Sequence, residues 1–312
     1  MDDKLKITVL RGGISAEREV SLISGAAVAN ALRSLGHQVF ESDVGPDNLA
    51  GLDQPCDVVF PVLHGVFGED GQIQEILEQR GVPYVGCRPP AARLAMDKAR
   101  TKACLAELDV PTAPWEIVGR EDFTASWRVS HAVGLPCVAK PPLEGSSVGC
   151  KVCHSESELR AFLAEMLQKY PEMMLERFIT GPELTIGIID GQALPTIQII
   201  PATTFYDYDA KYQRDDTRYV FDIDLPAATL AAARDAAVAT YKVLNVRHLG
   251  RVDVMVDART NQVYVLEINT MPGFTSHSLV PKAAAKAGIT FPQLCHRLVH
   301  LALRDVPANS YR

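Results

Sequence analysis

The sequence predicts a protein of mixed α/β and α+β class that begins with a doubly wound parallel sheet. Apolar strand-like runs alternate with helix-like runs through residues 1–93, and this order is typical of parallel strands joined by helical crossovers. Further along the chain, pairs of alternating apolar and polar runs enclose short turns, which predicts antiparallel hairpins. With 312 residues, the chain is long enough for two or three domains of ordinary size.

The N-terminal part carries the clearest strand and helix patterns. Its expected elements are strand 5–10, a helix over 20–36, and strands 38–43 and 57–63. Gly36 favours the end of the helix. Ligands bind beyond the carboxyl ends of the strands in such sheets, so the loops 11–19 and 64–71 are candidate walls of a site.

The rest of the chain divides into two further units. Residues 94–182 predict a small α+β unit with helix 97–108, a proline-broken connector at 110–115, strands 135–140, 151–154 and 173–179, and helix 155–169. Residues 183–312 predict hairpin 183–200, an alanine-rich helix 226–243, hairpin 250–269 and two C-terminal helices. We therefore expect three domains, with boundaries at 1–93, 94–182 and 183–312.

The composition excludes several classes of protein. A net charge of −7 argues against nucleic-acid binding as the main task, and no apolar run reaches the ~20 residues of a transmembrane helix. The N-terminus opens with acidic residues instead of the basic start of a secretory signal. We expect a cytoplasmic protein that binds neither nucleic acid nor membrane.

The seven cysteines, an odd number in a long chain, predict no disulfide framework. Cys150 and Cys153 have the C-x-x-C spacing of zinc and redox sites, but no second pair accompanies them. The run VGCKVCHS predicts a strand, in which residues three apart point to opposite faces. We interpret the two thiols as incidental, with zinc binding as the alternative.

A lysine at the end of an apolar strand precedes a glycine- and serine-rich loop, in the run KPPLEGSSVG from Lys140 to Gly149. Glycine lets backbone N–H groups approach an anion closely, serine adds donors, and the lysine supplies a point charge for phosphate. The run is not a Walker A loop, and no G-x-G-x-x-G follows a strand. By itself the loop is as compatible with a solvated hairpin turn as with a phosphate site.

Four polar side chains break the alternation of the hairpin 250–269. Folding this hairpin about residue 260 brings Asp253 opposite Glu267 and Arg251 opposite Asn269, at the end away from the turn. Carboxylate and amide oxygens suit Mg²⁺, and an arginine can hold a phosphoryl oxygen beside it. The alternative is a cross-strand salt-bridge cluster on a wet face of the sheet. The hydrophobic alternation breaks only at the open end of the hairpin, which favours a metal and phosphate site over a salt-bridge cluster.

Two more segments are candidates for ligand binding. The run 269–279 follows the hairpin with a Pro-Gly turn and a Ser/Thr cluster before an apolar helix, where capping or a carboxylate site is expected. The run 206–212 lies in a long polar stretch, which predicts a functional lid.

Several motifs, in order, carry a resemblance to a known family over residues 5–305. They are LRGGISAEREVSL, HGVFGEDG, MDKARTK, KPPLEGSSVG, TFYDYDAKY, GRVDVM, LEINTMPG and TSHSLVP. The chain closely resembles the D-alanine–D-alanine ligases of the ATP-grasp superfamily. The SAEREVS and HG-x-x-GEDG runs point to the D-alanine branch. Arg177-Phe178 stands where Lys-Trp is expected, and Met271 stands where Ser is common.

The resemblance implies an ATP-grasp fold with ATP between the central and C-terminal domains. It assigns ATP binding to Lys98, Lys140, Glu144, Ser147, Glu176, Arg177, Phe178, Ile179, Glu183, Phe205 and Lys211. Among these, the two lysines 98 and 140 would contact phosphates, 176–179 would form the adenine strand, and Glu183 would hold the ribose. It assigns two Mg²⁺ ions, or Mn²⁺, to Asp253, Glu267 and Asn269.

The resemblance also implies the substrate and catalytic residues. Glu17 would bind the ammonium of the first D-alanine, with His64 near it, and Ser146 and Tyr212 would form a network with Glu17 that closes the lid. Arg251 and the Gly273 N–H would stabilise the oxyanion. Ser278 and the Leu279 N–H would bind the second carboxylate. Tyr212, where D-lactate-using relatives often carry Phe, predicts the dipeptide as the product.

The implied reaction joins two D-alanines through an acylphosphate at the expense of ATP, for peptidoglycan precursor synthesis and so for the cell wall. A homodimer is implied as well. Two alternatives remain at this point: another ATP-grasp carboxylate–amine ligase, including a D-alanine–D-lactate ligase, and a nucleotide-binding regulator without turnover.

Overall fold

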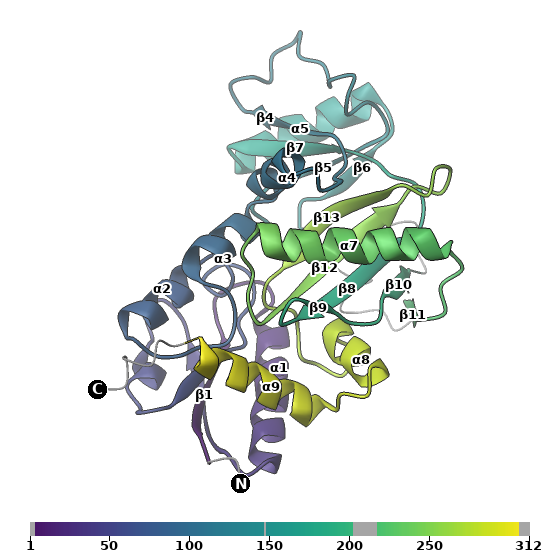
Figure 1. Ribbon diagram of the computed structural model, residues 1–312. Helices are drawn as coiled ribbons and strands as arrows, with labels where there is room; N and C mark the ends of the chain where they lie inside the picture. Colours follow the sequence, from purple (N-terminus) through teal and green to yellow (C-terminus); the bar gives the residue numbers. More distant parts are fainter. Residues whose placement is uncertain (1–3, 147, 202–216, 306–312) are drawn as a thin grey trace.

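A computed structural model describes residues 4–146, 148–201 and 217–305. Within these residues the strands form three sheets, stacked along the long axis of the molecule (Figure 1). The N-terminal sheet lies at one end, the four-stranded sheet at the other, and the largest sheet between them. No helix in this part of the chain is long and apolar enough to cross a bilayer.

The N-terminal sheet is parallel, as its sequence pattern predicts. Its central strand β1 (Lys6–Gly12) pairs on one side with β2 (Gln38–Val44) and on the other with β3 (Val58–Pro61). Helix α1 (Arg18–Ser34) packs on β1 and β2, and Gly36 follows it with a φ of +89°, which suits glycine. The loop after β1 therefore delivers residues 13–17 to the carboxyl edge of the sheet.

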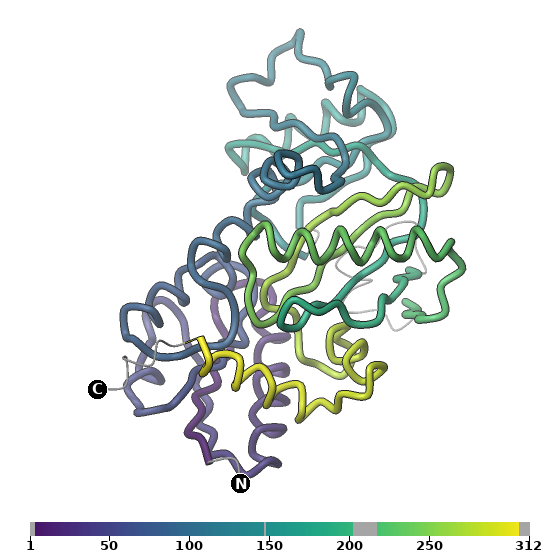
Figure 2. The backbone as a smooth tube through the Cα atoms, viewed as in Figure 1, coloured from purple at the N-terminus to yellow at the C-terminus, as the bar shows by residue number. Residues whose placement is uncertain are grey.

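The C-terminal helix returns to this N-terminal sheet. Helix α9 (Phe291–Arg304) packs against α1 and β3, and Figure 2 shows the two ends of the colour scale side by side. Its apolar side chains join those of β1 and α1 in one core cluster. Short helices complete this end of the molecule: η1 (Ala50–Leu52), α2 (Gln72–Gln79) and α3 (Pro89–Met96).

The four-stranded sheet is antiparallel, with the order β4-β7-β5-β6. Its strands are β4 (Trp115–Gly119), β5 (Cys137–Lys140), β6 (Lys151–Cys153) and β7 (Glu172–Arg177), and α5 (Glu156–Lys169) packs on it. Helix α4 (Lys98–Glu107) leads into it. The sequence pattern did not indicate β4, because Pro111 and Pro114 interrupt the residues before it. Cys153 is buried in β6, whereas Cys150 precedes this strand and is half-buried.

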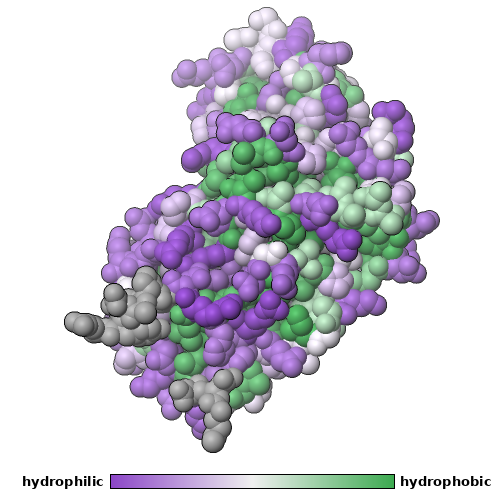
Figure 3. Space-filling view, in the orientation of Figure 1, coloured by the Kyte–Doolittle hydropathy of each residue, from purple (hydrophilic) through white to green (hydrophobic). Residues whose placement is uncertain are grey.

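The largest sheet has the order β11-β10-β8-β12-β13, with β9 beside β8. Its strands are β8 (Glu183–Ile189), β9 (Gln192–Ala193), β10 (Ile197–Ile200), β11 (Arg218–Val220), β12 (Leu249–Val256) and β13 (Val263–Asn269). Helix α7 (Ala227–Val243) covers one face, and α8 (Leu279–Lys286) packs on β8 from the other. In the space-filling view, apolar side chains gather around α7 and polar ones surround them (Figure 3).

The register of β12 and β13 confirms the pairing expected from the sequence. Asp253 lies opposite Glu267, and Arg251 lies opposite Asn269. A register shift follows Asp253, so that Val254 pairs with Val265. The bulge leaves the four polar residues in register with one another at the open end of the hairpin.

Candidate functional site

Three loops meet at the Glu17 carboxylate, which follows β1. The Ser146 hydroxyl, in the loop after β5, donates a hydrogen bond of 2.7 Å to Glu17 Oε1. A Cβ on Gly65, in the loop after β3, would lie 3.6 Å from Glu17 Oε2, and one on Gly145 would lie 3.8 Å from it. Gly65 has a φ of +63° and Ser146 one of +50°, so both turns use left-handed backbone. The fold thus brings together the segments 11–19, 64–71 and 140–149, as the sequence predicted for the first two.

His64 and Glu69 line the same place from the loop after β3. The buried His64 shares a hydrogen bond of 3.0 Å between its Nδ1 and the Met271 carbonyl, and its Nε2 has no described protein partner. Burial lowers the pKa of His64, although the charge of Glu17 opposes that effect. A neutral imidazole with one buried nitrogen that has no described protein partner suits a ligand.

Glu69 is a site residue that the sequence analysis did not single out. Its Oε2 accepts the Gly65 N–H at 2.7 Å and its Oε1 accepts the Met271 N–H at 3.3 Å. Burial, reinforced by the charge of Glu17, raises the pKa of Glu69 to about 8. This side chain joins the loop after β3 to the loop after β13. Its place within HGVFGEDG was the one available sequence signal.

The arginine of the hairpin is paired with its neighbouring carboxylate. Arg251 donates from Nε and Nη2 to the two oxygens of Asp253, at 3.0 and 2.8 Å. Asp253 is 4% exposed and also accepts the Thr185 hydroxyl at 2.6 Å. Thr185 stands opposite Asp253 on β8, so it fixes the carboxylate from the other side. This threonine is a second residue that the sequence reasoning missed.

The partners of Asp253 on β13 complete an oxygen-rich edge. Glu267 lies 3.5 Å from the ammonium of Lys98, and Asn269 Oδ1 accepts the Met271 N–H at 2.9 Å. Within the described residues, no group of three or more His, Cys, Asp or Glu side chains is arranged to hold a metal ion by itself. Two carboxylates and one amide on adjacent strands nonetheless match the donor set that Mg²⁺ shares with substrate phosphates.

Lysine side chains gather around one buried carboxylate near this edge. The Glu176 carboxylate, 2% exposed on β7, lies 2.8 Å from the Lys140 ammonium and 2.6 Å from that of Lys102. Lys98 donates to the Glu144 carbonyl at 2.5 Å, which ties α4 to the glycine-serine loop. The structure therefore brings Lys98, Lys140, Glu144 and Glu176 to one region. Lys102 was not predicted as a site residue.

The loop after β13 leads into the N-terminus of α8. The Ser278 hydroxyl makes hydrogen bonds of 2.9 Å to the Thr275 N–H and 3.0 Å to the Thr275 hydroxyl, and it does not cap the helix. Leu279 is the first residue of α8. A Cβ on Gly273 would lie 2.8 Å from the Ser278 oxygen, so glycine permits this close approach. The first turn of α8 offers the N–H groups of Leu279 and Val280 to an anion, since Pro281 has none.

The remaining predicted residues lie at the end of β7 or just after it, at the start of β8, or outside the described part. Arg177 ends β7 and donates to the Ala132 carbonyl, the Phe178 N–H donates to the Pro136 carbonyl at 3.2 Å, and Ile179 is buried. Glu183 opens β8 opposite Met255. Ser147, Phe205, Lys211 and Tyr212 lie outside the described residues.

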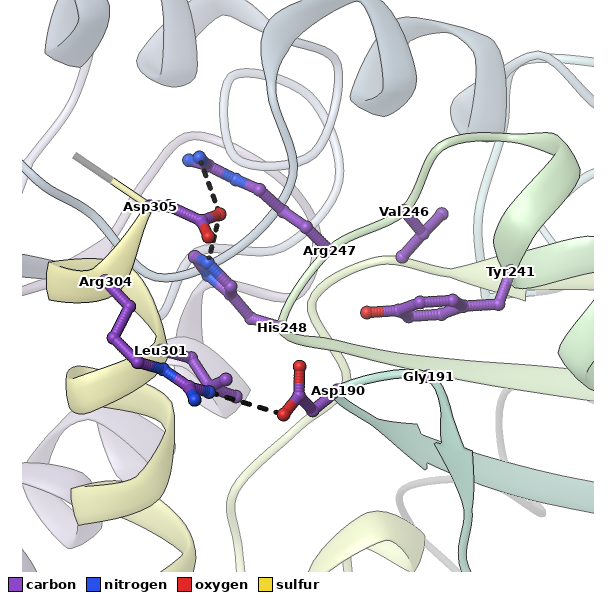
Figure 4. A pocket seen from close by; sticks show the side chains of 9 residues that line it. All are labelled: Asp190, Gly191, Tyr241, Val246, Arg247, His248, Leu301, Arg304 and Asp305. Carbon is purple, nitrogen blue, oxygen red and sulfur yellow. Dashed lines mark hydrogen bonds and ion pairs between the residues drawn. The ribbon is translucent and has the colours of Figure 1, made fainter. Parts of the chain in front are cut away.

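A cavity of about 500 Å³ lies away from these residues, and none of them lines it. Its charged side chains come from the turn after β8, the loop before β12 and the C-terminal end of α9, and they are paired with one another (Figure 4). Asp305 accepts from His248 at 3.0 Å and from Arg247 at 3.3 Å, while Arg304 lies 3.3 Å from Asp190. The ion pairs around this cavity join elements that are distant in sequence.

Comparison with known proteins gives a consistent relationship. The models "D-ala D-ala ligase C-terminus" and "D-ala D-ala ligase N-terminus" match residues 104–300 and 40–87. D-alanine–D-alanine ligase B of Chromobacterium violaceum is 44% identical over 297 residues, covering 94% of this chain and 96% of the relative. The D-alanine–D-alanine ligase of Mannheimia succiniciproducens is 42% identical over 300 residues, covering 95% and 97%.

A solved structure is similar over nearly the same length. The Bacillus anthracis D-alanine–D-alanine ligase complexed with ATP superimposes with a TM-score of 0.82 at 30% identity, covering 96% of this chain and 98% of that one. These relatives and the two matching models show that the chain belongs to the D-alanine–D-alanine ligase family, whose ATP-grasp fold it shares.

Proposed function

We propose that the chain is an ATP-dependent D-alanine–D-alanine ligase that supplies the dipeptide for peptidoglycan precursor synthesis. The hydrogen bond between Ser146 and Glu17 carries this proposal, because it joins two segments 129 residues apart. It sets a carboxylate, the complement of an amino-acid ammonium, beside the glycine-serine loop that follows Lys140. A nucleotide phosphate and an amino acid would therefore meet at one point, as an acylphosphate route requires.

The nucleotide would lie between the four-stranded sheet and the β12–β13 edge. Lys140 is 14% exposed in its side chain and pairs with Glu176, and an ammonium has three donors, so it retains donors for phosphate. Lys98, which already contacts the Glu144 carbonyl, would contact phosphate from α4. Asp253, Glu267 and Asn269 would hold two Mg²⁺ ions. The metal ions would supply charge neutralisation during phosphoryl transfer.

The amino-acid side of the reaction uses the other groups. Glu17 would bind the ammonium of the first D-alanine, whose carboxylate takes the γ-phosphoryl group of ATP with release of ADP. The amine of the second D-alanine would attack that acylphosphate, and phosphate would leave. Arg251 and the Gly273 N–H would stabilise the oxyanion, as preorganised donors do. Ser278 and the N-terminus of α8 would hold the second carboxylate.

Arg251 is held beside Asp253 in this structure. Its guanidinium now spends two N–H donors on Asp253. A metal ion bound to Asp253 would compete with Arg251 for the same two oxygens. Thr185 would continue to hold the carboxylate from β8 when the metal ion is bound.

The decisive experiment is a coupled assay of ADP release with D-alanine, other D-amino acids and D-lactate, followed by mass spectrometry of the products. We expect ADP release with D-alanine alone and D-alanyl-D-alanine as the main product. From equimolar D-alanine and D-lactate at pH 7, a predominant depsipeptide would contradict the expected product and the assignment of Tyr212. Nucleotide binding with no ADP release for any amino acid would support the regulator instead. A homodimer stays a prediction, which sedimentation analysis tests.

A further inference from the structure

Helix α4 carries two lysines one turn apart, and only Lys98 has a part in the function proposed above. The second, Lys102, is 0% exposed. Its ammonium lies 2.6 Å from Glu176 Oε1, 2.5 Å from the Thr112 hydroxyl and 3.4 Å from the Ala113 carbonyl. The contacts with Thr112 and Ala113 are hydrogen bonds, and the contact with Glu176 is an ion pair. Because Lys102 is fully buried among these protein groups, it is not placed to contact a ligand.

We infer that Lys102 is a positioning residue of the nucleotide site, which holds the Glu176 carboxylate and through it the Lys140 ammonium. The inference rests on the proposed nucleotide site, since Lys140 is the group that would face the phosphates. Lys102 acts on Lys140 through one shared carboxylate, whose two oxygens contact one lysine each at 2.6 and 2.8 Å.

The charges explain why a buried lysine would be retained here. Burial alone would raise the pKa of Glu176, but the charges of Lys102 and Lys140 outweigh it and hold the pKa below its usual value. Burial lowers the pKa of Lys102, although the charge of Glu176 opposes that effect, so the cluster keeps a net positive charge while Lys102 holds its proton. Without Lys102, Glu176 would neutralise Lys140 completely. The positive charge of Lys102 thus balances Glu176 and leaves the charge of Lys140 free to attract an anion.

A purely structural role explains this arrangement less well. Buried ion pairs stabilise proteins little, and well-packed apolar residues of similar volume often replace them without loss. Lys102 is buried on α4 together with Leu105, which belongs to an apolar core cluster, so an apolar side chain would be compatible there. Stability alone therefore does not account for the buried charge of Lys102, whereas a role in the nucleotide site does.

Lys102 also connects the two walls of the nucleotide site. The Thr112 hydroxyl that accepts from Lys102 donates in turn to the Val265 carbonyl of β13, at 2.8 Å. Lys98, one turn earlier on α4, reaches Glu267 on the same strand, at 3.5 Å. Helix α4 thus fixes Glu176 on β7 relative to the carboxylate edge on β13. The position of Lys140 relative to the metal-binding side chains depends on this connection.

The test compares Lys102→Met with Lys242→Met, a matched control at an exposed position in the last turn of α7. Calorimetric titration with ADP and Mg²⁺ measures nucleotide binding in the full chain without turnover. We expect Lys102→Met to weaken ADP binding and raise the KM for ATP about tenfold, equivalent to about 1.4 kcal/mol. The KM for D-alanine should stay within twofold. Lys242→Met should leave all three quantities unchanged.

A double-variant cycle tests whether Lys102 acts through Glu176. In a Glu176→Gln background the further change Lys102→Met should alter ADP affinity by less than twofold, because the carboxylate that transmits the effect is absent. A full tenfold effect in that background would overturn the inference. So would a Lys102→Met protein that melts at a lower temperature but binds ADP normally, since that result describes a merely structural lysine.

A second variant keeps the inference testable if Lys102→Met does not fold. Thr112→Val removes one acceptor from Lys102 and retains all three charges. We expect about threefold weaker ADP binding, and unchanged binding would overturn the inference. Because ADP titration does not require catalysis, a chain that makes no dipeptide would contradict the proposed function while this test of Lys102 remained valid.

Discussion

Replacing Glu69 with glutamine removes an acid whose pKa the fold raises from 4.5 to about 8. The cause is burial together with the charge of Glu17, which the N–H groups of Gly65 and Met271 only partly offset. Between these two pH values the unfolded chain has lost the proton and the folded chain retains it. The folded state binds more protons, so raising the pH destabilises it.

The interval from 4.5 to about 8 sets the size of the effect. Each pH unit is worth about 1.4 kcal/mol, so the contribution of Glu69 is complete below pH 4.5 and declines by about 5 kcal/mol at most as the pH rises through 8. The side chain is partly exposed, and contact with water lowers that ceiling. We expect about half of it, roughly 2–3 kcal/mol.

Urea unfolding of the unmutated protein and of Glu69→Gln, from pH 5 to pH 8.5, measures this contribution as a difference in free energy of unfolding. At pH 5 the unmutated protein should be the more stable, and its advantage should shrink or reverse by pH 8.5. Glu107→Gln, at the exposed end of α4, removes a carboxylate without this environment and controls for the change itself. Parallel pH curves for Glu69→Gln and the unmutated protein would refute the reasoning.

Three other predictions concern the metal edge, the thiols and the cavity lined by His248. Glu267→Gln should reduce turnover at limiting Mg²⁺ by at least about 100-fold with an unchanged melting temperature, because a metal ligand loses its charge; normal activity there would contradict the metal assignment. The double variant Cys150→Ser and Cys153→Ser should keep its activity, and metal analysis that finds one zinc per chain would show that the thiols are ligands. Burial, with the charge of Arg247, lowers the pKa of His248 to about 4, so this residue's contribution is present above pH 6.5 and is lost as the pH falls toward 4. Asparagine tolerates the φ of +63° at this position. The melting temperature of His248→Asn should therefore fall less between pH 7 and pH 5 than that of the unmutated protein, and an equal fall would contradict the lowered pKa of His248.

The hairpin that carries Asp253 and Glu267 shows how far local sequence pattern reaches. Alternation assigned the two faces of each strand, and a short turn fixed the pairing, so the register of Asp253 with Glu267 followed from the sequence. The same pattern could not indicate that Thr185, on a strand almost seventy residues earlier, would hydrogen-bond to Asp253. That contact depends on how β8 joins the sheet, which no short segment encodes.

The sequence indicated the site role of polar residues in helices less clearly than that of polar residues in the hairpin. Lys102 stands in the run MDKARTK, where a lysine at helical spacing is usually a solvated side chain. Its burial follows from the packing of α4 against β4 and α7, and only the folded chain gives it Glu176 and Thr112 as partners. The strand β4 was missed for a local reason, because the prolines before it conceal the start of pairing.

The sequence by itself determined the class of the fold, the parallel N-terminal sheet, the loops that follow its strands and the polar end of the hairpin. Each of these depends on side chains a few residues apart, where spacing and turn chemistry are sufficient. The tertiary structure alone decided that Glu17 contacts Ser146 and that α9 packs on the N-terminal core. It also decided that Glu69 bridges two loops and has a raised pKa. Those features arise from long-range packing and from the exclusion of water, and both exist only in the folded chain.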